Sequence, residues 1–468
     1  MTILLRKLFP VFLFLCGMTG AGGTSTAWAA DSPDDVPPLS TNERVVMVPA
    51  SGPERVMLQV TIMTPPGDGP FPLAVLNHGS NDKPAGQQER YYRSFGAYYF
   101  LSRGYAVVIP MMRGYAGSQG HQIYLHCNQE ETGLANARDI DAVIRYMEAQ
   151  RFIDPTRVVV AGASFGGWNA LAYGTMSRPE VKGLINFVGG ALISNCPFEA
   201  LSQDLALTHY AKATKLPSLW LYGQSDSRFP TSAWHAMFDN YAAAGGKAEL
   251  VDLGKFAPDT HNVWGGPEGL FAWSAKVDEF LGRVGLPDHV AHPEYVPTAF
   301  PPPTHAAAID DVDAVPYVDD TGRTSYRKFL ELPFPRVFFV APDGWGRFRA
   351  GGFDGLAAGK RICAAEGRQC VVYAVDDMVT WNGPPLTHAG GAVAPLPTPD
   401  DVPYLSERGR QAYRQFLKLH KPRAFAIAPD GGYAMATGNG DPSPTALADC
   451  SKAHKDCRLY VVDERLLK

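Results

Sequence analysis

The chain has 468 residues and a formal net charge of −5, with 42 Lys and Arg against 47 Asp and Glu. Hydrophobic residues make up 46% and charged residues 19%, a globular composition that excludes wholesale disorder and a collagen-like chain. No basic block stands out, which argues against a nucleic-acid partner. A single apolar run approaches membrane length, at the extreme N-terminus, and this argues against an integral membrane protein.

The N-terminus has the layout of an export signal. Arg6 and Lys7 precede an apolar run over residues 8–18, and Ala27-Trp28-Ala29 forms an A-x-A cleavage pattern. The sequence therefore predicts a signal peptide over residues 1–29 and an exported mature chain, periplasmic or secreted, with no membrane span after cleavage.

Strand-like and helix-like segments then alternate through residues 44–285. The expected strands are Arg55–Met63, Leu73–Asn77, Tyr105–Pro110, Arg157–Ala161, Gly183–Val188, Ser218–Tyr222 and Glu249–Leu253. The expected helices are Gly133–Gln150, Ala233–Ala244 and Phe271–Val284. This alternation predicts one open α/β domain over residues 40–285.

The strongest chemical signal is a G-x-S-x-G motif centred on Ser164, with Gly162 and Gly166 on either side. A strand precedes the motif and a helical stretch follows it, which is the context of a nucleophile elbow. A side chain in place of either glycine would crowd the turn. We expect Ser164 to be a nucleophile, and the amide of Phe165, at the start of the helix, to face the reacting carbonyl oxygen.

A serine hydroxyl needs a base to accept its proton, and in this kind of site the chain order is serine, acid, histidine. Asp226 follows a buried strand, and His261 lies on a loop between the next strand and the last helix. We expect these two residues to complete a catalytic triad. Asp204 is a weaker rival because its context is helical, and Asp259 is interpreted as a turn former.

An oxyanion hole needs a second backbone donor, from the loop after the third strand. That loop begins His78-Gly79-Ser80. We expect the amide of Ser80 to be the donor, with Asn81 as the alternative. His78 is interpreted as a packing residue. Arg113, after the fourth strand, has two interpretations, a ligand for a substrate carboxylate or a residue that holds its loop together, of which we favour the second.

The motifs together resemble a known superfamily. The matching residues are His78-Gly79, Arg113-Gly-Tyr-Ala-Gly-Ser118-Gln-Gly120, Gly162-Ala-Ser-Phe-Gly166-Gly167, Asp226 and His261. Residues 44–285 resemble an α/β-hydrolase, closest to the dienelactone-hydrolase-like and prolyl-oligopeptidase-like branches. The resemblance implies a mostly parallel sheet with helices on both faces and acyl transfer at the strand C-termini. Dienelactone hydrolases proper use cysteine where this chain has Ser164.

The C-terminal third is an internal duplication. Residues 313–376 align without gaps on residues 400–463, an offset of 87 positions with 25 identities in 64. We expect a Pro-rich linker over residues 286–309, a first small α+β module over 310–381, a second linker over 382–396 and a second module over 397–468. Trp345, Trp381 and Tyr433 are candidate contacts for a cell-envelope or protein ligand, although a core position is favoured for them.

Six of the seven cysteines remain once the predicted signal peptide, with Cys16, is removed. An even number in an oxidising compartment predicts disulfides. The repeat places Cys363 and Cys370 in the first module and Cys450 and Cys457 in the second, and each pair is expected to staple a thin core. Cys127 and Cys196 are then paired by elimination.

The prediction from the sequence is an exported serine hydrolase that cleaves a carboxylic ester through an acyl-enzyme and needs no metal or organic cofactor. Its expected partner is a small ester or short peptide substrate. Two alternatives stay open. One is a serine peptidase or amidase of the prolyl-oligopeptidase-like type, and the other is a non-catalytic binding protein that uses the C-terminal repeats.

Overall fold

The computed structural model describes residues 41–467, except positions 53, 82, 93, 124, 126, 193–195, 257–258, 385–395, 420–422, 438–441 and 464. The predicted signal peptide (1–29) and most of the predicted second linker (382–396) lie outside the described residues. Within the described part of the chain, no helix is long and apolar enough to cross a membrane.

An eight-stranded sheet forms the centre of the first unit, in the order β1-β2-β4-β3-β5-β6-β7-β8. The strands are β1 Arg44–Pro49, β2 Met57–Met63, β3 Phe71–Asn77, β4 Ala106–Pro110, β5 Ile153–Ala163, β6 Val181–Phe187, β7 Ser218–Tyr222 and β8 Ala248–Asp252. Strand β2 runs antiparallel to both of its neighbours, and every other pair is parallel. The expected mostly parallel sheet is confirmed.

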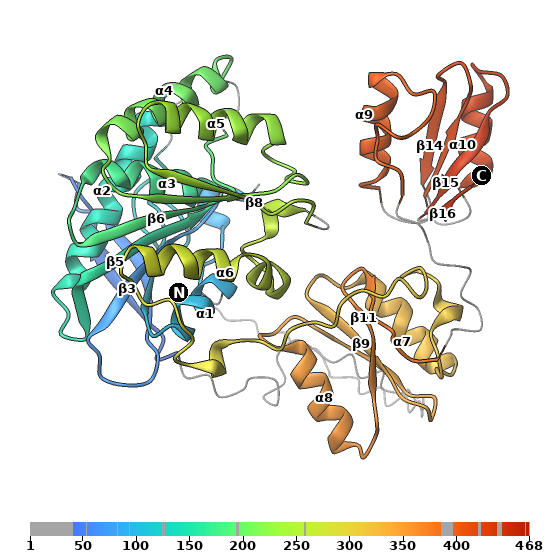
Figure 1. Cartoon of the computed structure of the whole chain (residues 1–468), viewed down its shortest axis with the longest axis horizontal. Coiled ribbons are helices and arrows are strands. Elements are labelled where there is room, and N and C mark those ends of the chain that lie inside the picture. The colour runs from blue at the N-terminus through green and yellow to red at the C-terminus, as the bar shows by residue number, and fades with distance from the viewer. Residues whose placement is uncertain are drawn as a thin grey trace, which may run out of the picture.

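Helices cover both faces of this sheet (Figure 1). Helices α1 (Phe95–Ser102) and α6 (Pro267–Arg283) pack together on one face. The other face carries α2 Gln129–Glu148, α3 Phe165–Tyr173, α4 Glu199–Ala213 and α5 Thr231–Ala243. The carboxyl ends of the parallel strands meet at one edge of the sheet, which is where ligands bind in open α/β folds.

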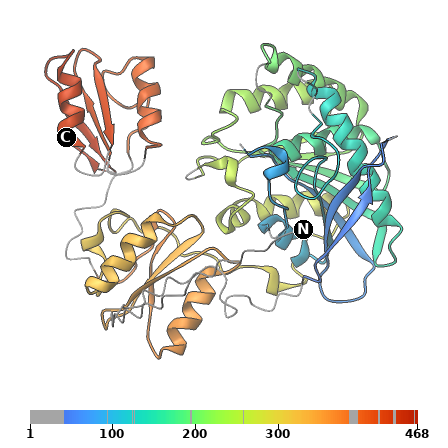
Figure 2. The ribbon, with the colours of Figure 1, turned by 180° about the vertical axis from the view of Figure 1, so that it is seen from behind.

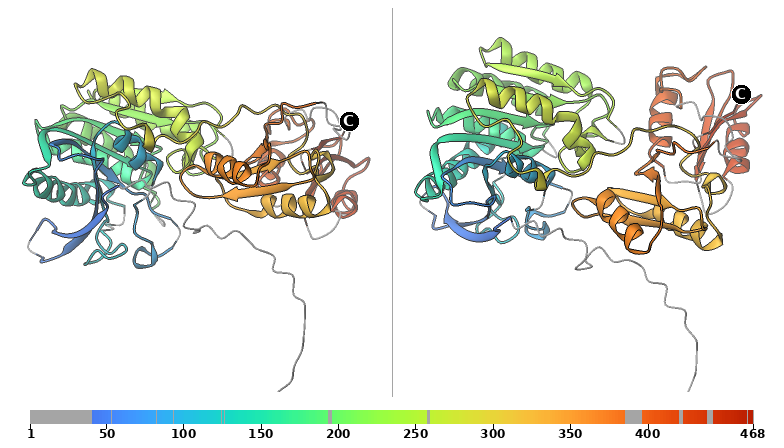
Figure 3. Two further views of the ribbon diagram at one scale, coloured as in Figure 1. Left: turned by 90° about the horizontal axis from the view of Figure 1, so that it is seen from below. Right: turned by 60° about the horizontal axis from the view of Figure 1, so that its bottom comes forward.

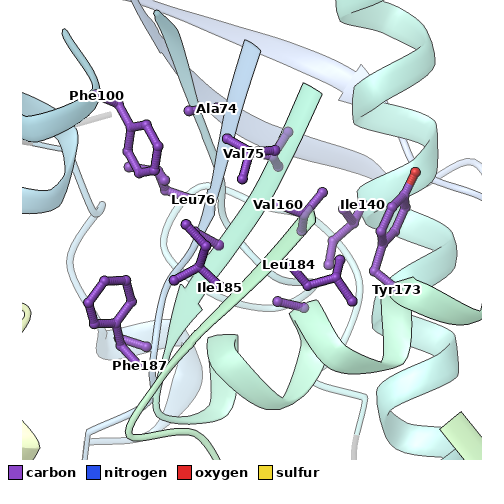
Figure 4. Close-up of a cluster of buried hydrophobic side chains, with 14 of the residues drawn as sticks. Ala74, Val75, Leu76, Phe100, Ile140, Val160, Tyr173, Leu184, Ile185 and Phe187 are labelled. Atoms are coloured by element: carbon purple, nitrogen blue, oxygen red, sulfur yellow. The ribbon is translucent and has the colours of Figure 1, made fainter. Parts of the chain in front are cut away.

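The core explains why the central strands are apolar throughout. Leu184 and Ile185 are neighbours on β6 and point to opposite faces of the sheet (Figure 4). Phe100 of α1 lies on one side and Tyr173 of α3 on the other, and all four side chains are fully buried. Because helices cover both faces, consecutive residues must all be apolar, and no alternation appears in the sequence.

Helix α1 was not predicted, and its packing explains the omission. All eight of its residues are buried. A helix that is buried on every side has no polar face, so the period that identifies an amphipathic helix is absent.

Part of the predicted Pro-rich linker over residues 286–309 packs on the main core. Leu286 and Tyr295 belong to the core of the eight-stranded unit, and the backbone amides of Ala291 and His292 donate to the carbonyl oxygen of Ser102. The chain then runs on to the first small sheet (Figure 3).

The two repeats form two small antiparallel sheets, ordered β10-β9-β11-β12 and β14-β13-β15-β16. The first has β9 Arg336–Val340, β10 Gly346–Ala350, β11 Val371–Val375, β12 Met378–Val379, α7 Asp320–Glu331 and α8 Gly355–Ala365. The second has β13 Arg423–Ile427, β14 Tyr433–Thr437, β15 Arg458–Val462, β16 Arg465–Leu466, α9 Glu407–Phe416 and α10 Ser443–Ser451. Figure 2 shows both modules from behind.

Each small sheet lies between two helices. In the first module, Phe338 on β9 packs in one cluster with α7, whereas its neighbour Phe339 packs in a second cluster with α8. The second module repeats this arrangement with α9 and α10. The candidate contacts Trp345 and Trp381 are 9% and 4% exposed, so the favoured core position is confirmed for them. Tyr433 is partly buried, with its ring stacked on that of Phe425.

Three disulfides join the predicted pairs: Cys127–Cys196, Cys363–Cys370 and Cys450–Cys457. The two bonds of the repeats connect the end of α8 or α10 to the residue just before the strand that follows. The first bond connects the segment before α2 to the segment before α4, so it joins two loops at the carboxyl edge of the large sheet.

The bond between Cys127 and Cys196 closes a loop ten times longer than those of the repeats, with separations of 69 against 7 positions. Loop-closure entropy assigns it about 4 kcal/mol of stabilisation, against about 2 kcal/mol for a repeat bond. We expect the paired substitutions Cys127→Ser and Cys196→Ser to lower the free energy of unfolding in urea about twice as much as Cys450→Ser with Cys457→Ser. Equal losses would contradict the entropic account.

Candidate active site

Ser164 occupies a strained turn between β5 and α3, with φ 54° and ψ −124°. The flanking glycines make this turn possible. A Cβ on Gly162 would lie 2.2 Å from the carbonyl oxygen of Gly166, and a Cβ on Gly166 would lie 2.0 Å from that of Asn77. The sequence motif therefore folds as the expected nucleophile elbow, which presents the serine side chain at the carboxyl edge of the sheet.

The structure brings the three predicted triad residues together. His261 Nε2 lies 3.0 Å from Ser164 Oγ, and its Nδ1 lies 3.1 and 3.2 Å from the two carboxylate oxygens of Asp226. The Asp226 side chain is fully buried, and its Oδ1 also accepts the amides of Arg228 and Phe229 at 2.8 and 2.9 Å. A carboxylate held in this way keeps the Nδ1–H donor toward itself and leaves Nε2 as the acceptor that faces the serine.

The two rival acids, Asp204 and Asp259, do not contact the imidazole nitrogens of His261 among the described residues. Asp204 lies in α4, and the structure places Asp226, not Asp204, against the imidazole. Asp259 Oδ1 accepts the amides of His261 and Ser227, both at 2.9 Å, so it shapes the turn that carries the histidine. Asp226 does not cap α5, which has no side-chain cap.

Two further histidines follow Ser164 before His261, and both are engaged away from it. His209 Nδ1 pairs with Glu130 at 2.7 Å, and the ring of His235 stacks on that of Trp234. His209 lies on α4 and His235 on α5, so neither is carried by a loop at the strand ends.

The loop after β3 lies directly on the nucleophile, since a Cβ on Gly79 would be 3.1 Å from Ser164 Cβ. The amide of Asn81 donates to Gln88 Oε1 at 3.3 Å, which occupies the alternative oxyanion donor. Gln88 Nε2 and the Tyr115 hydroxyl both donate to Ser80 Oγ, at 3.2 and 3.1 Å. Because the amide of Asn81 is occupied and the Ser80 side chain is held in place, these bonds favour the amide of Ser80 as one oxyanion donor. The other expected donor is the amide of Phe165, the first residue of α3.

Gln88 is a structural support of the site that the sequence analysis missed. Its amide nitrogen also donates to the carbonyl oxygen of Lys83 at 2.9 Å, so one buried side chain bonds Ser80, Asn81 and Lys83. A glutamine in an irregular segment has no periodicity or spacing that marks it, and this role follows from the tertiary structure alone.

His78 is buried and neutral. Its Nδ1 lies 2.6 Å from the carbonyl oxygen of Gly79, to which it must donate, and its Nε2 accepts the amide of Met112 at 3.0 Å. Burial lowers the pKa of His78 to about 4, while its bond to Gly79 acts in the opposite direction. His78 is therefore a packing residue, as predicted, and its ring also bonds the backbone of Gly79, next to the expected oxyanion donor.

This burial predicts an acid-sensitive fold. A folded pKa of about 4 against 6.5 in the unfolded chain means that unfolding takes up a proton as the pH falls between these values. The stability conferred by neutral His78 is complete above pH 6.5 and decreases by about 3 kcal/mol toward pH 4. We expect His78→Gln to show a smaller loss of unfolding free energy between pH 7 and pH 4.5 in urea titrations. Parallel pH dependences for the two proteins would refute this.

Arg113 is occupied by structural contacts. Its Nε and one terminal nitrogen donate to the two oxygens of Asp139, at 2.6 and 2.8 Å, and Glu54 lies 3.3 Å from the other terminal nitrogen. The side-chain bond to Asp139 raises the pKa of Arg113. This fork-like pairing supports the interpretation of Arg113 as a residue that holds its loop in place.

The mostly parallel sheet, the elbow and the arrangement of Ser164, His261 and Asp226 are those of an α/β-hydrolase fold. Residues 91–188 match the prolyl oligopeptidase family (Peptidase_S9), which confirms the resemblance to the prolyl-oligopeptidase-like branch over that part of the chain. No curated protein sequence matches the chain.

Several solved structures are similar to it. The puromycin-hydrolyzing peptidase of Mycobacterium tuberculosis is 18% identical over 53% of this chain and 41% of its own, with a TM-score of 0.42. The acylaminoacyl peptidase of Pyrococcus horikoshii is 20% identical over 53% and 42%, also with a TM-score of 0.42. An esterase of Pyrococcus furiosus is 16% identical over 52% and 93%, with a TM-score of 0.38. The chain thus spans less than half the length of the two peptidases.

Proposed function

We propose that this protein is an exported serine hydrolase that cleaves carboxylic esters through an acyl-enzyme. The observation that carries the proposal is the continuous contact from Ser164 Oγ through His261 to the buried carboxylate of Asp226. Ser164 attacks the carbonyl carbon, and His261 Nε2 takes the hydroxyl proton and later gives it to the leaving alcohol. The amides of Phe165 and Ser80 stabilise the oxyanion, and water then releases the acyl group from Ser164.

Export is part of this proposal. Three disulfides within the described residues support an oxidising compartment. The predicted signal peptide, outside the described residues, accounts for delivery to it.

The second candidate is a peptidase or amidase with the same mechanism. The match of residues 91–188 to the prolyl oligopeptidase family favours it. An ester is ranked first because an alcohol leaves an acyl carbon more readily than an amine does and requires less assistance from leaving-group contacts.

The test is intact-mass analysis of the mature protein after reaction with a fluorophosphonate, followed by 4-nitrophenyl esters and the matching anilides. One adduct, mapped to Ser164, together with a larger rate enhancement over uncatalysed hydrolysis for the esters than for the anilides, supports the proposal. A larger rate enhancement for the anilides supports the amidase. If no adduct forms, the proposal is wrong and a binding role for the repeats takes its place.

A further inference from the structure

The first small module contacts the eight-stranded unit through an aromatic side chain. Phe353 lies in the loop between β10 and α8 and packs against the main core. Its ring centre is 4.5 Å from that of Tyr98, edge to face, and 6.1 Å from that of Phe95, in a stacked arrangement. Both partners belong to α1, so the module is joined to this helix by aromatic contacts that contribute beyond their buried area.

Helix α1 in turn contacts the segment that carries the candidate catalytic histidine. A Cβ on Gly96 would be 2.0 Å from the ring of Trp264, so helix and ring are in tight contact. Trp264 is buried and lies three residues after His261. The contact with the module is therefore transmitted through one packed helix to the backbone next to His261.

The module also faces this segment directly. We call residues 259–269, from the turn of His261 to the first residues of α6, the histidine segment. A cavity of about 330 Å³ lies between it and the module, with Asn262 and Glu268 on one side and Phe334 and Asp376 on the other. The module thus forms a wall opposite the histidine segment.

A pair of carboxyl groups connects the two walls. Burial raises the pKa of Glu268 to about 7, and the nearby carboxylate of Asp376, which lines the same cavity, adds to the shift. Burial likewise raises the pKa of Asp376 to about 6. Two carboxyl groups in contact share a proton at lower pH and repel each other when both are ionised.

Comparison of the two repeats shows which contacts of Asp376 belong to the fold of each module and which features occur in the first module alone. Asp376 Oδ1 accepts the amide of Arg336 at 2.7 Å, and its counterpart Asp463 accepts that of Arg423 at 2.8 Å. Both aspartates have a positive φ, 50° and 52°. The fold of the module therefore uses this aspartate in either copy. Phe353, by contrast, aligns with a glycine in the second repeat. Asp376, in the first module, is the aspartate that lies near Glu268.

We propose that the first module positions His261, through the packing of Phe353 on α1 and the contact of Asp376 with Glu268 of the histidine segment. This proposal rests on the proposed function, since it assigns a role to the module in the same reaction. Neither Glu268 nor Phe353 touches the reacting atoms. They act as positioning residues, because a small displacement of a base relative to its nucleophile lowers the rate steeply.

The charged groups around the pair set the direction of the pH dependence. Glu268 faces the carboxyl groups of Asp376 and Asp377. Arg336 faces Asp376, and its guanidinium bonds Asp377 at 2.6 Å. Because the folded pKa values are raised, the pair stabilises docking at low pH. That stabilisation is lost as the pH rises through about 6 to 7.

The test uses the full mature chain and the variant Glu268→Gln, whose amide can donate to Asp376 but does not ionise. We measure kcat and KM for 4-nitrophenyl acetate from pH 5 to pH 9. In the wild type, docking loosens as the pH rises through about 6 to 7, and kcat is then lowered relative to the variant, by about tenfold at pH 9, with KM nearly unchanged. Phe353→Ala is expected to lower kcat by about tenfold at every pH.

Asp463→Asn is the matched control, because it alters the same structural aspartate in the module copy that has no counterpart of Phe353. Its pH profile should follow that of the wild type. Hydrogen exchange of residues 259–269 reports docking without any need for activity, and we expect faster exchange in Phe353→Ala. A Glu268→Gln profile superimposable on that of the wild type, or unchanged exchange in Phe353→Ala, overturns the proposal. A wild type that a fluorophosphonate does not label at Ser164 overturns the proposed function instead.

Discussion

Replacing Ser164 by alanine is expected to lower kcat by about 10⁵-fold or more, the loss seen when a triad nucleophile is removed. The reason is geometric as well as chemical, since the hydroxyl is the group that lies 3.0 Å from His261 Nε2. Removing it leaves the base with no proton to accept. The measurement is steady-state hydrolysis of 4-nitrophenyl acetate, with the fluorophosphonate adduct as a second readout.

The control for this variant is Ser232→Ala. Ser232 is an exposed serine on α5, so the substitution removes a hydroxyl without touching the elbow. We expect full activity and one adduct. Because Ser164 has a φ of 54°, alanine meets the same backbone strain as serine, and both proteins should have similar melting temperatures. Retained activity in Ser164→Ala would exclude the serine mechanism.

The second large effect is expected from Asp226→Asn, at about 10⁴-fold in kcat, the size that follows when the imidazole adopts the wrong tautomer. Asparagine can keep Oδ1 as the acceptor for the amides of Arg228 and Phe229. Its Nδ2 then faces His261 Nδ1 and donates to it. The imidazole proton moves to Nε2, where the ring can no longer accept the proton of Ser164.

Asp259→Asn is the matched control for this acid. Asp259 lies two residues from His261, and its Oδ1 accepts two amides, which an asparagine oxygen can also do. We expect its kcat to remain within a few-fold of the wild type, because it makes no contact with the imidazole nitrogens among the described residues. If Asp259→Asn loses activity as severely as Asp226→Asn, the assignment of the triad acid is wrong.

Much of the site follows from short stretches of sequence because its geometry is imposed locally. The turn at Ser164 requires glycines at positions 162 and 166, where any Cβ would meet backbone atoms, so the elbow is visible as a motif. Asp226 and His261 each follow a strand, and parallel strands bring their carboxyl ends to one edge. Chain order and strand ends were sufficient to predict that the three residues meet.

Ser80 was expected from the sequence as the second oxyanion donor, with its neighbour Asn81 as the alternative. What favours Ser80 physically is visible only in the tertiary structure. The difference comes from Gln88, whose side chain occupies the amide of Asn81 and supports the hydroxyl of Ser80. Arg113 is similar, since its partner Asp139 lies on α2 and the pairing depends on how that helix packs against the sheet.

The sequence by itself determined the nucleophile turn, the order of the triad, the α/β class, the duplication of the C-terminal module and the cysteine pairs. Each of these depends on local backbone requirements, on periodicity or on self-similarity. The tertiary structure alone decided how the first module is joined to the rest of the chain. Phe353 meets Phe95 and Tyr98, and Asp376 meets Glu268, across more than 100 positions of sequence. Such contacts arise from the packing of whole elements, and no single segment has a pattern that encodes them.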